Sequence, residues 1–188
     1  LTATSLMVRG GDYASASACC NGSSSGNGQG TVIHNATAKI FAGQDATFTV
    51  NTGPGTMLVR GGDFGSASAC CNGDENATLG SANVSLDTSA VVQATGMLTL
   101  DASSITIRGG DSNEVSACCN GSSGGNGVVN IESRANATVH GETLTVSAAS
   151  LSVLGGDSNS DYTCCNAESG GAATSAVLLE ANAQLSAD

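Results

Sequence analysis

The sequence predicts an all-β protein, and more narrowly a parallel β-solenoid (β-helix) built of four imperfect repeats of 46–51 residues. Three observations lead to this fold class. One unusual motif occurs four times, polar and apolar residues alternate around each copy, and aromatic residues make up only 3% of the chain. We expect a single domain over residues 1–188, with repeats at approximately 6–56, 57–104, 105–150 and 151–188.

The repeated motif is Gly-Gly-Asp, followed after six residues by two adjacent cysteines. Its first glycine is Gly10, Gly61, Gly109 or Gly155, which gives spacings of 51, 48 and 46 residues. The six-residue gap is constant, whereas the differences in length fall behind the cysteines, in stretches such as "NGSSSGNGQG" and "NGSSGGNG". We therefore interpret the motif segment as a rigid unit and the stretch behind it as an adjustable loop.

Around the motif the hydrophobic period is two, as in "SLMVRG", "TMLVRG", "SITIRG", "ATFTVN" and "TLTVSA". This period is typical of half-buried strands, and no segment shows a sustained helical period. Each repeat is predicted to hold about four short strands, which form either a propeller blade or a coil of a solenoid. Propeller blades usually carry an aromatic signature, so the solenoid is favoured.

The composition excludes several functional classes. The formal net charge is −11, which repels nucleic acid and anionic membranes. No run approaches eighteen apolar residues, so we expect no membrane span.

The cysteines all lie in adjacent pairs, which favours an oxidising, extracellular setting. Three states remain open: disulfides between adjacent coils or neighbouring subunits, a soft metal such as Cu or Zn bound by thiolates, and free thiols. If each repeat forms one coil, equivalent cysteines lie about 5 Å apart, within reach of a disulfide; two coils would place them about 10 Å apart. One coil is favoured because the gap is constant. The candidates are Cys19, Cys20, Cys70, Cys71, Cys118, Cys119, Cys164 and Cys165.

The Gly-Gly-Asp elements are candidate turn and ladder residues. Glycines suit a corner with a backbone conformation that other residues avoid, and the aspartate can cap that turn. Arg9, Arg60 and Arg108 precede three of the motifs and can balance the aspartates, but Leu154 stands in the fourth. Calcium bound by the aspartates is an alternative. The twelve residues are Gly10, Gly11, Asp12, Gly61, Gly62, Asp63, Gly109, Gly110, Asp111, Gly155, Gly156 and Asp157.

Asn-X-Ser/Thr triplets are candidate N-glycosylation sites and agree with an extracellular or cell-surface location. In a chain this rich in Asn, Ser and Thr, chance also produces such triplets. The six asparagines are Asn21, Asn35, Asn76, Asn83, Asn120 and Asn136.

The sequence does not predict an enzyme. Catalysis needs a cluster of acid, base and charge-stabilising groups that does not simply repeat. His34 and His140 occupy different parts of their repeats, Lys39 is the only lysine, and the acidic residues recur with the repeats. We expect both histidines to be exposed strand residues.

The stretch "ETLTVSAASLSVLGGD", Glu142 to Asp157, resembles the repeats of filamentous-haemagglutinin-like bacterial exoproteins. This resemblance implies a secreted right-handed parallel β-helix used as an adhesin. The cysteine pairs depart from the usual form of that family. The chain is also similar in its properties to proteins of extracellular filaments and sheaths.

The sequence therefore predicts a structural protein of an extracellular filament, sheath or stalk, with copies stacked end to end and a disulfide ladder of Cys-Cys pairs. The alternatives are an adhesin segment and a metal-binding fibre, and instead of stacking end to end the chain could be a segment of a longer repetitive exoprotein. No cofactor is expected beyond the soft metal or calcium left open above, and the partners are further copies of the chain, with cell-surface or polysaccharide contacts also open.

Overall fold

The computed structural model describes residues 1–188 except 23–28, 51–54, 74–78, 122–125, 158–159 and 168–172. The described residues form strands in three sheets, and every strand pairing is parallel. The predicted all-β class with parallel strands is confirmed. No described residue lies in a helix that is long and apolar enough to cross a membrane.

The first sheet has six strands and holds the alternating segments that precede each motif. Its order is β1-β5-β9-β6-β2, and β12 pairs with β9 on the other side. β9 pairs with both β5 and β6, so one long strand before the third motif corresponds to two short strands before the second motif. The sheet is composed of β1 (Thr2–Ala3), β2 (Ser5–Arg9), β5 (Ala46–Val50), β6 (Thr56–Arg60), β9 (Met97–Arg108) and β12 (Thr143–Leu154).

The second sheet contains the segments that end in the cysteine pairs. Its order is β13-β10-β7-β3, so neighbours in the sheet come from successive copies of the motif. Small residues such as Ala67 and Ala69 face the core from this sheet. The strands are β3 (Tyr13–Gly22), β7 (Phe64–Gly73), β10 (Ser112–Gly121) and β13 (Asp161–Ala167).

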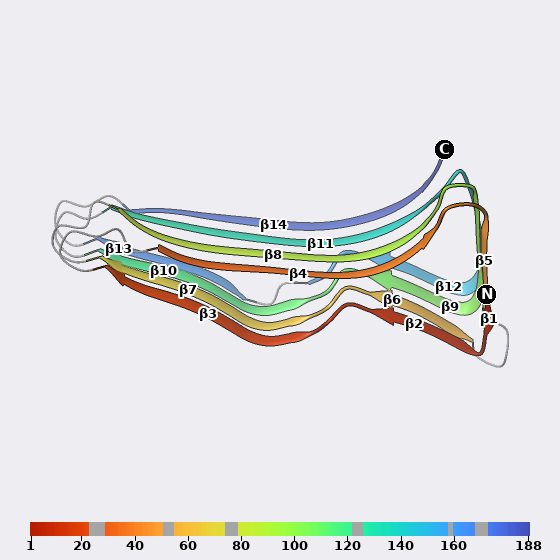
Figure 1. Cartoon of the computed structure of the whole chain (residues 1–188), viewed down its shortest axis with the longest axis horizontal. Helices are drawn as coiled ribbons and strands as arrows, with labels where there is room; N and C mark the ends of the chain where they lie inside the picture. Colours follow the sequence, from red (N-terminus) through yellow and green to blue (C-terminus); the bar gives the residue numbers. More distant parts are fainter. Residues whose placement is uncertain (23–28, 51–54, 74–78, 122–125, 158–159, 168–172) are drawn as a thin grey trace.

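The third sheet is formed by the long strands that follow the loops, in the order β14-β11-β8-β4. Figure 1 shows this sheet lying across from both other sheets, with β4 and β14 at its two edges. The adjustable loops predicted behind the cysteines fall largely outside the described residues. The strands are β4 (Gln29–Ala42), β8 (Leu79–Ala94), β11 (Asn126–Gly141) and β14 (Ala173–Ala187).

Two apolar clusters fill the space between the sheets. Between the second and third sheets the cluster is rich in alanine and valine, such as Ala69, Ala82 and Val115. Between the first and third sheets it contains larger side chains, such as Leu98 and Ile105. The period-two pattern produces both clusters, because alternate residues of each strand face inward.

Candidate functional site

Equivalent residues of successive copies are direct neighbours throughout the motif segment. In the second sheet Tyr13 pairs with Phe64, and in the first sheet Arg9 pairs with Arg60, which pairs with Arg108. No strand of another copy lies between them. Identical side chains therefore stack at the separation of adjacent parallel strands, about 4.8 Å.

The arginines and aspartates of the motif form a continuous ladder of ion pairs. Nη2 of Arg60 lies 2.9 Å from Asp63 of its own copy and 2.9 Å from Asp111 of the next. Arg108 likewise contacts Asp111 at 2.7 Å and Asp157 at 2.5 Å. Arg9 repeats the arrangement with Asp12 at 3.0 Å and Asp63 at 3.3 Å. The predicted balance of arginine and aspartate charges is confirmed, and each arginine bridges two copies.

The aspartates also bind the backbone of the next copy. The amide of Asp63 donates to Oδ1 of Asp12 at 3.0 Å, and the amide of Asp111 donates to Oδ1 of Asp63 at 2.9 Å. The amide of Asp157 donates to Asp111 at 2.7 Å. These bonds run between copies, because the parallel register brings the next amide directly over each carboxylate. A cap by each aspartate on its own turn stays a prediction.

The second glycine of the last three motifs is required by close packing of the stacked backbones. A Cβ atom on Gly62 would collide with the carbonyl oxygen of Gly11, and one on Gly110 would collide with that of Gly62. A Cβ atom on Gly156 would collide in the same way with the carbonyl oxygen of Gly110. None of the eight motif glycines has a φ in the left-handed region, so the expected reason, an unusual backbone conformation, is wrong. At these three positions the need for glycine comes from the neighbouring copy. Gly109 and Gly155 lie instead against the third-sheet strand of their own copy, near Ala135 and Ala181.

The cysteine pairs lie in two columns of the second sheet, one residue apart along each strand. Cys19 pairs with Cys70, which pairs with Cys118, which pairs with Cys164. The second column runs through Cys20, Cys71, Cys119 and Cys165. Cys19 is exposed, Cys70 and Cys118 are half-buried, and Cys70 is a free thiol.

The two histidines lie in strands but are less exposed than expected. The ring of His34 lies 4.8 Å from the ring of Tyr13 and 4.5 Å from that of Phe64, and its Nε2 atom is buried. Its register partner Leu86 belongs to the core, which explains the inward position. His140 is half-buried, and its Nδ1 atom lies 3.1 Å from the hydroxyl of Ser186.

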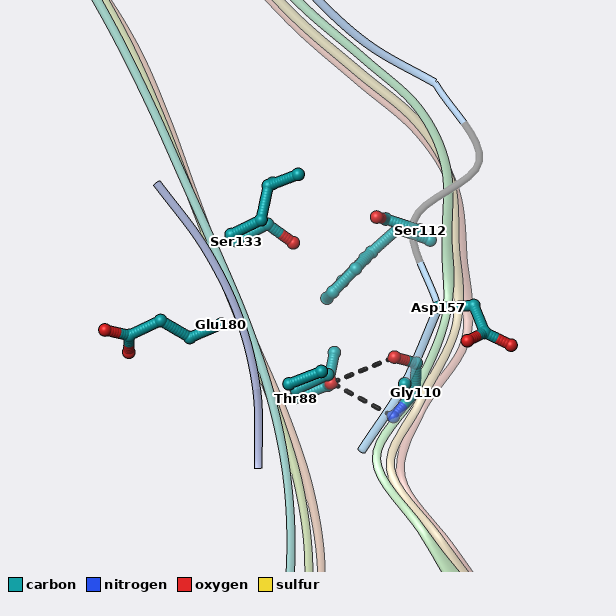
Figure 2. Close-up of a pocket in the computed structure, with 11 residues that line it drawn as sticks. Thr88, Gly110, Ser112, Ser133, Asp157 and Glu180 are labelled. Carbon is teal, nitrogen blue, oxygen red and sulfur yellow. Dashed lines mark hydrogen bonds between the residues drawn. The ribbon is translucent and has the colours of Figure 1, made fainter. Parts of the chain in front are cut away.

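A cavity of about 220 Å³ opens beside these inward positions and is lined by residues of the second, third and fourth copies (Figure 2). Where the first two copies have Tyr13 and Phe64, the third has Ser112. Where they have His34 and Leu86, the third has Ser133. Two serines replace large side chains at one level of the stack, and the space between the sheets stays empty there.

A threonine on the wall of the cavity holds the Gly-Gly corner. Thr88 is buried and sits where the other copies have Ala36, Ala135 and Ala181. Figure 2 shows its hydroxyl accepting from the amide of Gly110 at 3.0 Å and donating to the carbonyl of Gly110 at 3.2 Å. Thr88, Ser112 and Ser133 were not singled out from the sequence. Aligning the four copies would have marked Thr88 as a single exception among alanines, and Ser112 and Ser133 as small residues where the first two copies have large ones.

The outer faces of the sheets present polar ladders. Nδ2 of Asn130 donates to Oδ1 of Asn83 at 2.9 Å, and Nδ2 of Asn182 donates to Oδ1 of Asn136 at 3.1 Å. Asn83 and Asn136 are glycosylation candidates, so a glycan on either would disrupt a ladder.

The remaining glycosylation candidates are less informative. Asn35 lies exposed in β4. The side chains of Asn21 and Asn120, and the whole of Asn76, lie outside the described residues.

Many of the described acidic side chains, namely the motif aspartates, Glu132 and Glu180, lie against arginines. In the third sheet Nε of Arg134 donates to Glu180 at 2.9 Å, and this bond raises the pKa of Arg134. Among the described residues no three His, Cys, Asp or Glu side chains are grouped so that they could hold a metal ion. The aspartates proposed for calcium are instead paired with arginine wherever the motif supplies one.

The chain matches no protein-family model, no curated protein and no solved structure. Its function is therefore argued from its own residues.

Proposed function

We propose that the chain is a parallel β-solenoid that serves as a structural element of an extracellular filament, sheath or stalk. Each copy of the motif forms one coil, and whole chains stack end to end by the contacts that join the coils. The proposal assigns no catalytic role to the chain.

The observation that carries the proposal is the register between copies. Glycine lies over glycine, arginine over arginine and aspartate over aspartate, and each arginine joins the aspartates of two copies. A unit that binds its own successor by repeated contacts is suited to elongation rather than to binding one small ligand. The core between the second and third sheets consists mainly of small side chains such as alanine and valine, so a single coil buries little apolar area and stacking adds to it.

The cysteine columns are proposed to cross-link the stack when it meets an oxidising environment. Neighbouring parallel strands place paired Cα atoms about 4.8 Å apart, within the range of about 4.4–6.8 Å that disulfides span. Oxidised glutathione would take up the two hydrogen atoms released when two thiols join. Each such bond is worth roughly 2–4 kcal/mol of stability.

The experiment that tests this function combines assembly with thiol chemistry. The purified chain is concentrated in reductant and followed by static light scattering and negative-stain electron microscopy, where filaments one molecule wide are expected. A chain that remains monomeric at all concentrations would overturn the proposal.

The same chain is then treated with oxidised glutathione and its intact mass is measured before and after alkylation. We expect thiols to become resistant to alkylation, with a loss of two hydrogen atoms for each bond. Elemental analysis checks the metal-binding alternative: stoichiometric metal, with thiols that alkylate only after chelation, would favour a metal-binding fibre instead.

A further inference from the structure

The last copy leaves its inward-facing side chains uncovered. Val177 and Leu185 of β14 are 46% and 49% exposed, whereas their register partners Ile131 and Val139 in β11 are 2% and 0% exposed. The partners are buried because another strand lies over them. β14 has no such neighbour, since it forms the edge of the third sheet (Figure 1).

The cavity lies next to this uncovered edge. Leu179 of β14, which is 51% exposed, forms part of its wall, and Phe64 of the second copy contributes to the opposite side. The cavity is therefore bounded by three successive copies and stays empty because of Ser112 and Ser133.

The opposite edge of the stack carries aromatic side chains at the positions that Ser112 and Ser133 occupy beside the cavity. Tyr13 lies in β3 and His34 in β4, the edge strands of the second and third sheets. Tyr13 is 44% exposed. Because register places Tyr13 above the same position as Phe64 and Ser112, this aromatic pair and the cavity occupy the same place in the cross-section of the stack.

The first motif also keeps a glycine that the isolated chain does not need. Gly62, Gly110 and Gly156 each lie against the carbonyl oxygen of the preceding copy's glycine. Gly11 has no atom within 4 Å of where its Cβ would lie. A preceding Gly156 from another molecule would supply the missing contact.

We propose that the edge bearing Tyr13 and His34 docks onto the β14 edge of a second copy of this chain, with the Tyr13 ring entering the cavity. The inference rests on the proposed function and adds to it the contact that fixes the register of one molecule on the next. The occupant of the cavity is thus a side chain of the same protein.

The size and chemistry of the cavity fit this occupant. An engineered apolar cavity of about 150 Å³ admits benzene, so about 220 Å³ leaves room for a phenol ring. A buried tyrosine hydroxyl needs a polar partner. The hydroxyls of Thr88 and Ser133 line the cavity and can supply one.

Such an interface joins two different surfaces of the molecule. Head-to-tail contacts of this kind grow into open fibres unless a rotation closes them into a ring. Each molecule therefore carries one aromatic edge and one cavity edge, and a defect in either leaves the other intact.

Two variants test the two edges one at a time. Each introduces a residue that the fold already has at an equivalent position of another copy. Tyr13→Ser places at the aromatic edge the residue found at Ser112, and Ser133→Leu fills the cavity with the residue found at Leu86 and Leu179. Ile33→Ser is the matched control, because Ile33 is an exposed apolar residue of β4 whose register partner is Ser85.

Association is measured by sedimentation velocity over a concentration series. Tyr13→Ser and Ser133→Leu each remove the burial of one aromatic side chain at the interface. The dissociation constant of each variant should therefore rise roughly tenfold to a hundredfold. The dissociation constant of Ile33→Ser should remain within about twofold of the wild-type value, which is well below a tenfold change. Circular dichroism and thermal unfolding at high dilution check that each variant is folded.

A mixing experiment makes the test specific. Tyr13→Ser keeps the cavity and Ser133→Leu keeps the aromatic edge, so an equimolar mixture should form one-to-one dimers and nothing longer. If both variants associate as tightly as the wild type, the docking is wrong although the proposed function survives. The same conclusion follows if the wild type associates but the mixture forms no dimers. If only Ser133→Leu is weakened, the cavity takes another group and the docking is also wrong. A wild-type chain that never associates overturns both.

Discussion

Arg60 and Asp111, 51 residues apart in the sequence, lie with Nη2 and Oδ2 2.9 Å from each other. The same nitrogen is 2.9 Å from Oδ1 of Asp63 in its own copy. The side chains of all three are less than one third exposed. The ladder therefore joins copies through partly shielded charges, which weaken less in salt than fully exposed pairs.

Arg60→Leu is expected to lower the free energy of unfolding by about 1–2 kcal/mol, because two charge-assisted hydrogen bonds are lost. In this variant Asp63 is still paired with Arg9, and Asp111 is still paired with Arg108, so neither carboxylate is left without a cation. Urea unfolding of the dilute chain measures the change. An unchanged midpoint would mean that the ladder contributes nothing to stability.

Leu154→Arg is the reciprocal change, since it restores the arginine that the fourth motif lacks. Its new partner Asp157 has a side chain that is 79% exposed, so water already solvates the charge. We expect a gain below about 1 kcal/mol in the same urea assay. If Leu154→Arg raised the free energy of unfolding by more than Arg60→Leu lowers it, shielding of the ion pairs from water would not determine their strength.

Gly62→Ala is expected to destabilise the chain by about 1–3 kcal/mol or more, because the new methyl group collides with a stacked carbonyl. Gly43→Ala is the control: a Cβ there meets no atom within 4 Å. Thermal unfolding followed by circular dichroism compares the two. Equal midpoints would show that the backbones can separate at little cost.

Thr88→Val tests the polar wall of the cavity. The valine keeps the shape of the side chain but removes the hydroxyl that bonds both backbone groups of Gly110. We expect a loss of about 1–3 kcal/mol in urea unfolding. Thr88→Ser keeps the hydroxyl and should recover most of that loss; equal losses in both would assign the effect to packing instead.

The sequence was sufficient for the class of fold and for the partners within the motif. The constant gap between Asp12 and Cys19, repeated in each copy, predicted which residues stack, and the pairing of Cys19 with Cys70 agrees with it. The ion pairs followed from the same logic. Boundaries between the repeats stay a prediction.

The site at the cavity could not be read in the same way, because it depends on contacts between sheets. The alternation of β4 places His34 on the same face as the buried Val32 and Ala36, but it does not tell which side chains of the other sheet meet the ring. Tyr13, His34 and Phe64 meet only after two sheets have packed together. The close approach of Gly62, Gly110 and Gly156 to the preceding copy likewise cannot be read from a single motif.

Because the space beside Gly11 is open in the free molecule, a substitution of this residue could be used to limit the length of the polymer. A methyl group there has room in the free molecule, so Gly11→Ala should fold with the stability of the wild type. In the proposed filament it would block only the edge that carries Tyr13, and the variant would act as a chain stopper at one end. Adding it in increasing proportion should shorten the mean filament length seen by electron microscopy, which turns the degree of polymerisation into a quantity set by stoichiometry.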